Sequence, residues 1–197
     1  MFDANIFMVG IENKTSDPNC SFANMKELYL IPLFESFKEI IVHQKVYNEL
    51  DEERKNFVNS YKNVTIVDEN NLYGLDPKYT TIFNNIARCM DYERHMSKDQ
   101  GEVYSLAYAA FHNINYFCCK EIKIDYLSNE LIELKDVQVI TFDIIVLLAF
   151  IYYNSRKDMS HNKALKAIYK RYCEDVIKRH KLPQTLKEYF LACQNYI

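Results

Sequence analysis

The chain has few of the residues that form tight turns, and it has no tryptophan. Only 3 of its 197 residues are glycine and 4 are proline. An all-β sandwich needs many such turns, so this scarcity disfavours that class of fold. Hydrophobic residues make up 49% of the chain and aromatic residues 14%, which is enough to bury a sizeable core. We expect one domain at this length, with room for an extension.

Long apolar segments and several common active-site motifs are also missing. The best apolar run, residues 144–153, is much shorter than a helix that spans a bilayer. The first residues contain no basic segment followed by a cleavage site, so we expect a cytoplasmic protein with no membrane partner. No glycine-rich phosphate loop, serine nucleophile motif or dinucleotide fingerprint occurs in the sequence.

Cysteine and histidine do not occur at the spacings of a metal site. The six cysteines contain no CxxC pair, and adjacent cysteines on a strand point to opposite faces. We interpret them as reduced, buried thiols. No two histidines are four residues apart, and we interpret all five as structural or surface residues. The cysteines are Cys20, Cys89, Cys118, Cys119, Cys173 and Cys193, and the histidines are His43, His95, His112, His161 and His180.

Charge is distributed unevenly along the chain. Residues 155–197 contain ten Lys and Arg but four Asp and Glu, a net charge of +6, whereas the other 154 residues have a net charge of −9. A basic segment of this kind indicates either an anionic partner or a solvated helix face. Apolar residues recur at helical spacing in the same segment and predict a packing face. They are Leu165, Ile168, Tyr169, Tyr172, Val176 and Ile177.

Short strand-like runs alternate with helical patterns. This alternation predicts an α/β fold in which crossover helices connect the strands of a parallel sheet. Beyond the first apolar stretch of the chain, strands are expected at residues 39–42, 64–67, 114–119 and 137–140. Helices are expected at 43–61, 76–94, 99–113, 123–134 and over most of 142–197, with breaks near 158–160 and at Pro183. The polar residues 68–78 are expected to form a loop.

Four acidic residues follow the expected strands. Asp3 ends the first apolar stretch, Glu49 lies in the helix after the second strand, Glu102 begins a later helix, and Glu121 follows the strand that ends at Cys119. Ligands of parallel α/β sheets bind at the carboxyl ends of the strands. Clustered carboxylates repel one another unless a cation neutralises them, and oxygen ligands suit Mg²⁺ or Mn²⁺. Such an ion polarises a phosphoryl oxygen and activates water.

Each acid also has a structural interpretation. Asp3 fits a turn, and Glu49 belongs to an acidic stretch typical of a solvated helix face. Asp99 and Glu102 have the spacing of a capping box, in which an acid accepts a hydrogen bond at the start of a helix. Glu121 fits a loop charge. The functional interpretation therefore depends on the whole set.

Four segments resemble those of the PIN-domain nucleases. The opening Phe2-Asp3-Ala4-Asn5 is similar to the first-strand Asp-x-Asn pattern of that family. Residues 41–50 resemble the strand and helix that carry its second acid, and residues 101–109 resemble the Gly-Glu-Ala segment of its bacterial toxin-type ribonucleases. Residues 137–149 resemble its last strand and helix. The resemblance covers roughly residues 1–153.

The resemblance implies a fold and a division of the chain. It implies a three-layer α/β/α domain over residues 1–154, with a central parallel sheet of about five strands. Residues 155–197 then form a basic helical C-terminal extension.

The resemblance also implies an activity, namely Mg²⁺- or Mn²⁺-dependent cleavage of RNA. Asp3, Glu102 and Glu121 would hold the ion, with Glu49 as a further ligand or as the base that orients water. Asn5 matches the residue that supports the first acid, and Asp99 could support Glu102 from the capping box. Many such ribonucleases are toxins of toxin–antitoxin pairs, so an antitoxin protein joins RNA as an expected partner, and a homodimer is a further candidate assembly.

Lys120 departs from the family pattern. It stands where the family has the first acid of a pair, and Glu121 stands where the second is found. A lysine there reduces the negative charge that attracts a metal ion. The alternative function is therefore a catalytically weak or inactive PIN-like module that binds RNA or a protein partner. A nuclease acting on structured DNA is a third option.

Overall fold

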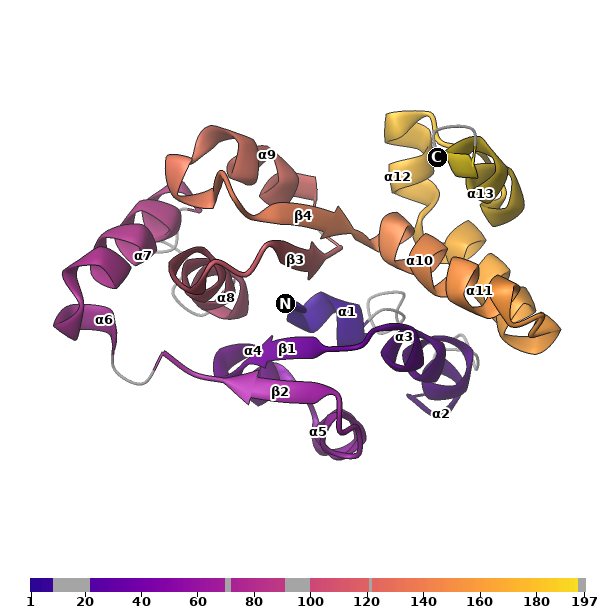
Figure 1. The fold of residues 1–197 in the computed structure, drawn as a ribbon, viewed down its shortest axis with the longest axis horizontal. Coiled ribbons are helices and arrows are strands. Elements are labelled where there is room, and N and C mark those ends of the chain that lie inside the picture. Colours follow the sequence, from indigo (N-terminus) through magenta and orange to yellow (C-terminus); the bar gives the residue numbers. More distant parts are fainter. Residues whose placement is uncertain (9–21, 70–71, 91–99, 121, 195–197) are drawn as a thin grey trace. The chain divides into compact units, whose positions relative to one another are not determined.

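The computed structural model describes residues 1–8, 22–69, 72–90, 100–120 and 122–194. Helices contain most of these residues, and the strands are four in number and short (Figure 1). Contacts divide the chain into two units. The first comprises Met1–Phe7 and Glu39–Thr141, and the second comprises Met8–Lys38 and Phe142–Ile197. Within the described residues, no helix combines the length and apolar character needed to cross a membrane.

The first unit contains all four strands and the helices between them. Its strands are β1 (Ile40–His43), β2 (Val64–Val67), β3 (Tyr116–Cys119) and β4 (Gln138–Thr141). Its helices are α4 (Gln44–Glu49), α5 (Glu52–Asn59), α6 (Leu72–Leu75), α7 (Pro77–Cys89), α8 (Gln100–His112), α9 (Ile122–Glu130) and the 3₁₀ turn η4 (Ile132–Leu134). Helix α1 (Ala4–Met8) begins in this unit.

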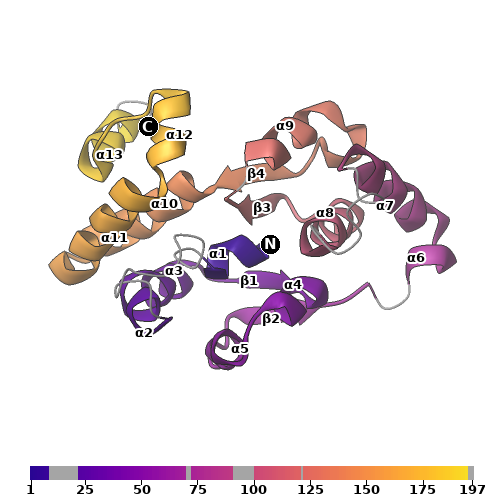
Figure 2. The same ribbon diagram turned by 180° about the vertical axis from the view of Figure 1, so that it is seen from behind.

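The expected α/β fold, a three-layer α/β/α domain with a central parallel sheet of about five strands, is wrong, because the described residues are mainly helical. The strands form two two-stranded parallel sheets, β1 with β2 and β3 with β4 (Figures 1 and 2). The expected first strand is reduced to Phe2, which forms isolated parallel bridges to Val42 and Cys118. The backbone N–H of Asn5 donates to the Asp3 carboxylate at 3.3 Å, and α1 begins at Ala4. This turn ends the extended backbone after a single bridging residue, so no fifth strand forms at the start of the chain.

The local predictions in this unit are largely confirmed, with two helices divided. The helix expected over 123–134 is α9 followed by the 3₁₀ turn η4, because Leu131 between them is extended. The strands expected at 39–42, 64–67, 114–119 and 137–140 correspond to β1 to β4, and the helix expected at 99–113 is α8. The helix expected over 43–61 is two helices, because Leu50 is extended and Asp51 starts a new one. The Asp51 carboxylate accepts a hydrogen bond from the Arg54 N–H at 2.9 Å, which caps α5.

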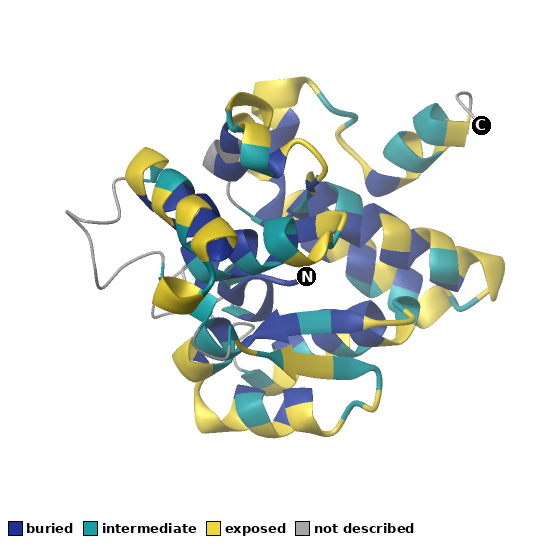
Figure 3. Cartoon of the chain, turned by 60° about the vertical axis from the view of Figure 1, so that its left-hand side comes forward, coloured by how far each residue is buried: buried dark blue, intermediate teal, exposed yellow. Residues whose placement is uncertain are grey.

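The core of the first unit lies mainly between α7, α8 and the β3–β4 pair. Helices α7 and α8 pack together, and Val103, Leu106 and Phe117 are fully buried in this cluster. Strand β1 is almost entirely buried, whereas β2 is half-buried or exposed along its length (Figure 3). Strands β1 and β3 are therefore more deeply buried in the core of the unit than β2 is.

The second unit is entirely helical within the described residues. Its helices are α2 (Phe22–Met25), the π-helix η2 (Lys26–Leu30), α3 (Ile31–Ser36), α10 (Phe142–Ser155), α11 (Met159–Tyr172), α12 (Glu174–His180) and α13 (Leu186–Gln194). The expected breaks near 158–160 and at Pro183 are confirmed, and a further break occurs at Cys173. The predicted packing face over 165–177 is also confirmed, since all six of its residues are buried.

Helix α10 groups with the helices that follow it. It packs against α3, α11 and α13, and the Tyr153 hydroxyl donates to Glu35 at 2.6 Å. The division by contacts therefore falls at Thr141, whereas the resemblance places it at residue 154. Residues 22–36, which precede β1 in the chain, belong to the same helical unit.

Candidate active site

Asp3 is held at the carboxyl end of the strands that Phe2 bridges. Its backbone N–H donates to the Cys118 carbonyl at 3.0 Å, and its side chain is only 2% exposed. The Asn5 side-chain oxygen accepts a hydrogen bond from the Lys120 N–H at 2.9 Å, while the Asn5 N–H donates to Asp3. The structure thus brings together three of the predicted residues, Asp3, Asn5 and Lys120.

A second contact joins Glu49 to the start of α8. The Glu49 carboxylate accepts a hydrogen bond from the Gly101 N–H at 3.0 Å. A Cβ atom at Gly101 would lie 2.8 Å from Val46 Cγ2 and 2.9 Å from the same Glu49 oxygen, so only glycine allows α4 and α8 to approach this closely. Glu102 follows Gly101 and is 5% exposed.

The contact with Gly101 gives Glu49 a structural role. The first N–H groups of a helix have no partner within the helix, and its N-terminus carries a partial positive charge. A carboxylate on α4 therefore stabilises the start of α8 through the Gly101 N–H. The role of Glu49 as a ligand or base stays a prediction.

The predicted acids do not form a close cluster within the described residues. In that part of the chain, one group of three or more His, Cys, Asp or Glu side chains has ligand atoms within 4.8 Å of one another, and it contains none of the predicted acids. Asp99 and Glu121 lie outside the described residues. Their predicted roles, like the ligand roles of Asp3 and Glu102, stay predictions.

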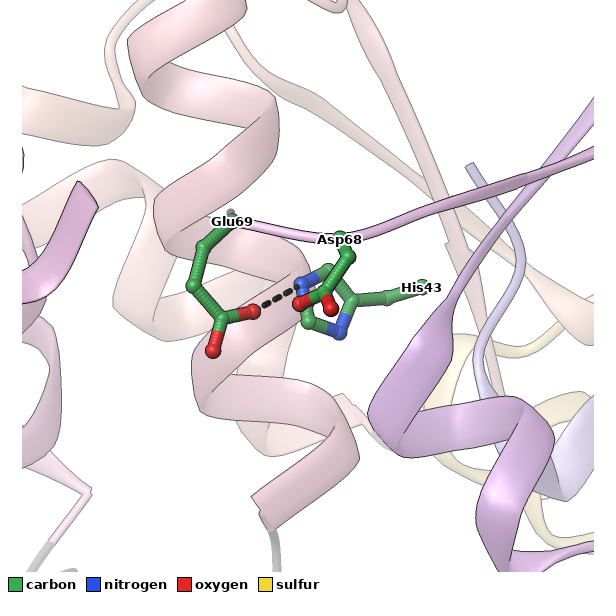
Figure 4. Close-up of side chains that lie close together, drawn as sticks. All are labelled: His43, Asp68 and Glu69. Carbon is green, nitrogen blue, oxygen red and sulfur yellow. Dashed lines mark ion pairs between the residues drawn. The ribbon is translucent and has the colours of Figure 1, made fainter. Parts of the chain in front are cut away.

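The group that the structure does bring together is His43, Asp68 and Glu69 (Figure 4). His43 ends β1, and the two acids directly follow β2, its parallel neighbour. Atom Nε2 of His43 lies 3.1 Å from a carboxylate oxygen of Glu69. In Figure 4 the Asp68 carboxylate also lies beside the His43 ring. The interpretation of His43 as a structural residue and of 68–78 as a loop misses this group. The loop prediction is also wrong in part, because residues 72–75 form α6 and α7 begins at Pro77.

The surroundings of His43 keep its ring neutral and fixed. The side chain is fully buried, and desolvation lowers the pKa of His43 to about 4, with Asp68 opposing and Lys45 adding to the shift. The ring stacks against Tyr104 and meets Tyr108 edge-on, with centroid distances of 5.8 and 5.7 Å. A neutral imidazole has one nitrogen with a proton and one with a free electron pair.

The pKa values of the two acids are shifted in opposite directions. Burial raises the pKa of Glu69, and the neighbouring Asp68 carboxyl raises it further. A hydrogen bond with Glu69 lowers the pKa of Asp68.

The sequence contained a signal for this group. His43 directly follows the strand expected at 39–42, and Asp68 directly follows the strand expected at 64–67. The pairing of His43 with Val67 places them at the same end of the β1–β2 pair. Periodicity alone does not reveal which strands are neighbours, so this proximity required the register.

Comparisons with protein-family models, curated proteins and solved structures find no match for this chain.

Proposed function

We propose that the chain is a metal-dependent ribonuclease that hydrolyses phosphodiester bonds with Mg²⁺ or Mn²⁺. Asp3 and Glu102 are the ligands in the described residues, and Glu121 is the predicted third ligand. A divalent ion bound there would polarise a phosphoryl oxygen and activate the attacking water. A role as the toxin of a toxin–antitoxin pair, an antitoxin partner, a homodimer and a cytoplasmic location belong to the same proposal and rest on the sequence.

The burial of two carboxylates carries the proposal. Asp3 is 2% exposed and Glu102 is 5% exposed. Placing a carboxylate in the interior costs free energy unless hydrogen bonds or a cation compensate for the lost hydration. Asp3 also lies at the carboxyl end of parallel bridges, the place where ligands of parallel sheets bind. The donor set consists of oxygen atoms only, which fits a hard divalent cation.

Two isosteric substitutions test the ribonuclease proposal. Asp3→Asn and Glu102→Gln preserve side-chain shape and remove the charge that would hold the ion, so RNA cleavage in Mn²⁺ should fall by orders of magnitude. Asp136→Asn and Glu53→Gln, at exposed positions of the same unit, are the matched controls. If Glu102→Gln lowers the melting temperature but leaves cleavage intact, Glu102 has a structural role and is not a ligand.

RNA or protein binding without catalysis is the second candidate, and Lys120 favours it. Its backbone is tied through Asn5 to Asp3, so a cationic residue replaces the expected acid directly beside the first ligand. A flexible ammonium group is a poor substitute for an ion with fixed ligand geometry. Substitution of Lys120 by aspartate separates the two candidates, because it restores the acid that the family has at this position.

A further inference from the structure

His43, Asp68 and Glu69 combine a buried imidazole with two carboxylates. Their ligand atoms all lie within 4.8 Å of one another. His43 Nε2 and the Glu69 oxygen lie 3.1 Å apart, yet neither atom makes a hydrogen bond of acceptable geometry with any described residue. Burial of His43 is complete, and its Nε2 faces the Glu69 carboxylate (Figure 4). A polar atom so deeply buried normally has a partner.

An ion between these atoms would supply that partner. Zn²⁺ binds imidazole nitrogen and carboxylate oxygen at about 2.0–2.2 Å, so two ligand atoms of a tetrahedral site are roughly 3.3 Å apart. The 3.1 Å separation of His43 Nε2 and Glu69 is close to that value. Asp68 is exposed and follows the end of β2, so its carboxylate can approach without a change in the core.

We propose that His43, Asp68 and Glu69 form a binding site for a divalent transition-metal ion of the Zn²⁺ type. Three protein ligands, one nitrogen and two oxygens, leave a fourth tetrahedral position open to water or a small anion. The site uses none of the residues assigned to the ribonuclease centre and does not depend on that assignment. Contacts with Tyr104 and Tyr108 fix the ring and so prepare the nitrogen ligand before the ion arrives.

Binding requires a specific rearrangement of protons. His43 Nδ1 accepts a hydrogen bond from the Lys45 N–H at 3.1 Å, so the neutral ring carries its proton on Nε2. An ion on Nε2 moves that proton to Nδ1, and the ring stays neutral. The Lys45 N–H then loses its acceptor, and any proton bound to either carboxyl group passes to solvent. The Lys45 amide is therefore a reporter of metal binding at His43.

Zn²⁺ titration of the ¹⁵N-labelled full chain tests the site. Correlation spectra of the histidine ring nitrogens should show a large shift of His43 Nε2 and protonation of Nδ1, together with a shift of the Lys45 amide. By calorimetry, Asp68→Asn should weaken Zn²⁺ binding at least tenfold. Asp136→Asn, which removes an exposed aspartate elsewhere in the unit, should leave the affinity unchanged.

Two results would overturn the site. One is a His43 ring whose nitrogen shifts do not change at saturating Zn²⁺, including the case in which the ion binds only to the exposed thiol of Cys89. The other is an Asp68→Asn variant that binds Zn²⁺ as tightly as Asp136→Asn does. A chain that fails to cleave RNA but shows the His43 shift would refute the ribonuclease proposal and retain this site.

Discussion

Replacement of Gly101 by alanine tests the contact between α4 and α8. The new Cβ would lie 2.8 Å from Cγ2 of Val46, which is fully buried, and 2.9 Å from Oε1 of Glu49. Overpacking of this kind costs about 1–3 kcal/mol. Displacement of the Glu49 carboxylate also weakens its hydrogen bond to residue 101, a loss of about 1.5 kcal/mol for a charged acceptor.

The higher helix propensity of alanine offsets part of this loss of stability. Alanine is more favourable than glycine within a helix by about 0.5–1 kcal/mol. The net expectation is that Gly101→Ala lowers the free energy of unfolding by about 3 kcal/mol. For a chain of this size, each kcal/mol corresponds to a change in melting temperature of about 2–4 °C, so a decrease of roughly 6–12 °C should appear in a thermal melt followed by circular dichroism.

A double-mutant cycle identifies the cause of the decrease. Val46→Ala removes the Cγ2 atom that the new Cβ would meet. In that background, the cost of Gly101→Ala should fall by at least about 1 kcal/mol, because residues in contact are not additive. A Gly101→Ala variant as stable as the wild type, or the same cost in both backgrounds, would refute the argument from close approach.

Three further predictions concern the metal, Lys120 and His43. Millimolar Mn²⁺ should raise the melting temperature of the wild type more than that of Asp3→Asn, with EDTA as the control, and equal shifts would argue against an ion at Asp3. Lys120→Asp should raise Mn²⁺ affinity and RNA cleavage if Lys120 weakens the site, and a drop in cleavage with unchanged metal binding would contradict this. Because the pKa of His43 is lowered from 6.5 to about 4, the unfolded chain binds the extra proton between these values. The contribution of neutral His43 to the free energy of unfolding is therefore fully present above pH 6.5 and is lost, by about 3 kcal/mol, as the pH falls towards 4. In urea unfolding, His43→Gln should flatten the dependence of this free energy on pH, and an unchanged dependence would assign it to other groups.

Local sequence patterns predicted most helices and strands of the fold, but they did not predict how many strands pair into one sheet. The β-branched run at 64–67 and the apolar residues of 137–140 are strands in the structure, and the capped segment at Asp76-Pro77 begins a helix. The first apolar stretch failed as a strand because Asp3 and Asn5 favour a turn over continued pairing. Asp51 was a readable start signal for α5, since an acid there caps the N–H three residues later.

The candidate sites were less predictable than the strands. The sequence identified Asp3 and Glu102 as acids at strand and helix ends, and both are buried, which is uncommon for carboxylates. It could not show that Glu49 contacts Gly101, because residues 52 positions apart meet only after α4 and α8 have packed. The group around His43 depends in the same way on the pairing of β1 with β2.

Single-turnover RNA cleavage, measured side by side for the wild type and Asp3→Asn, tests the central claim most directly. The wild type should cleave RNA in millimolar Mn²⁺ and should lose this activity in EDTA. Asp3→Asn should cleave RNA about a hundredfold more slowly, or slower still, and should melt at a similar temperature. Cleavage that persists in EDTA, or that is equal in the two folded proteins, would contradict a metal-dependent ribonuclease centred on Asp3.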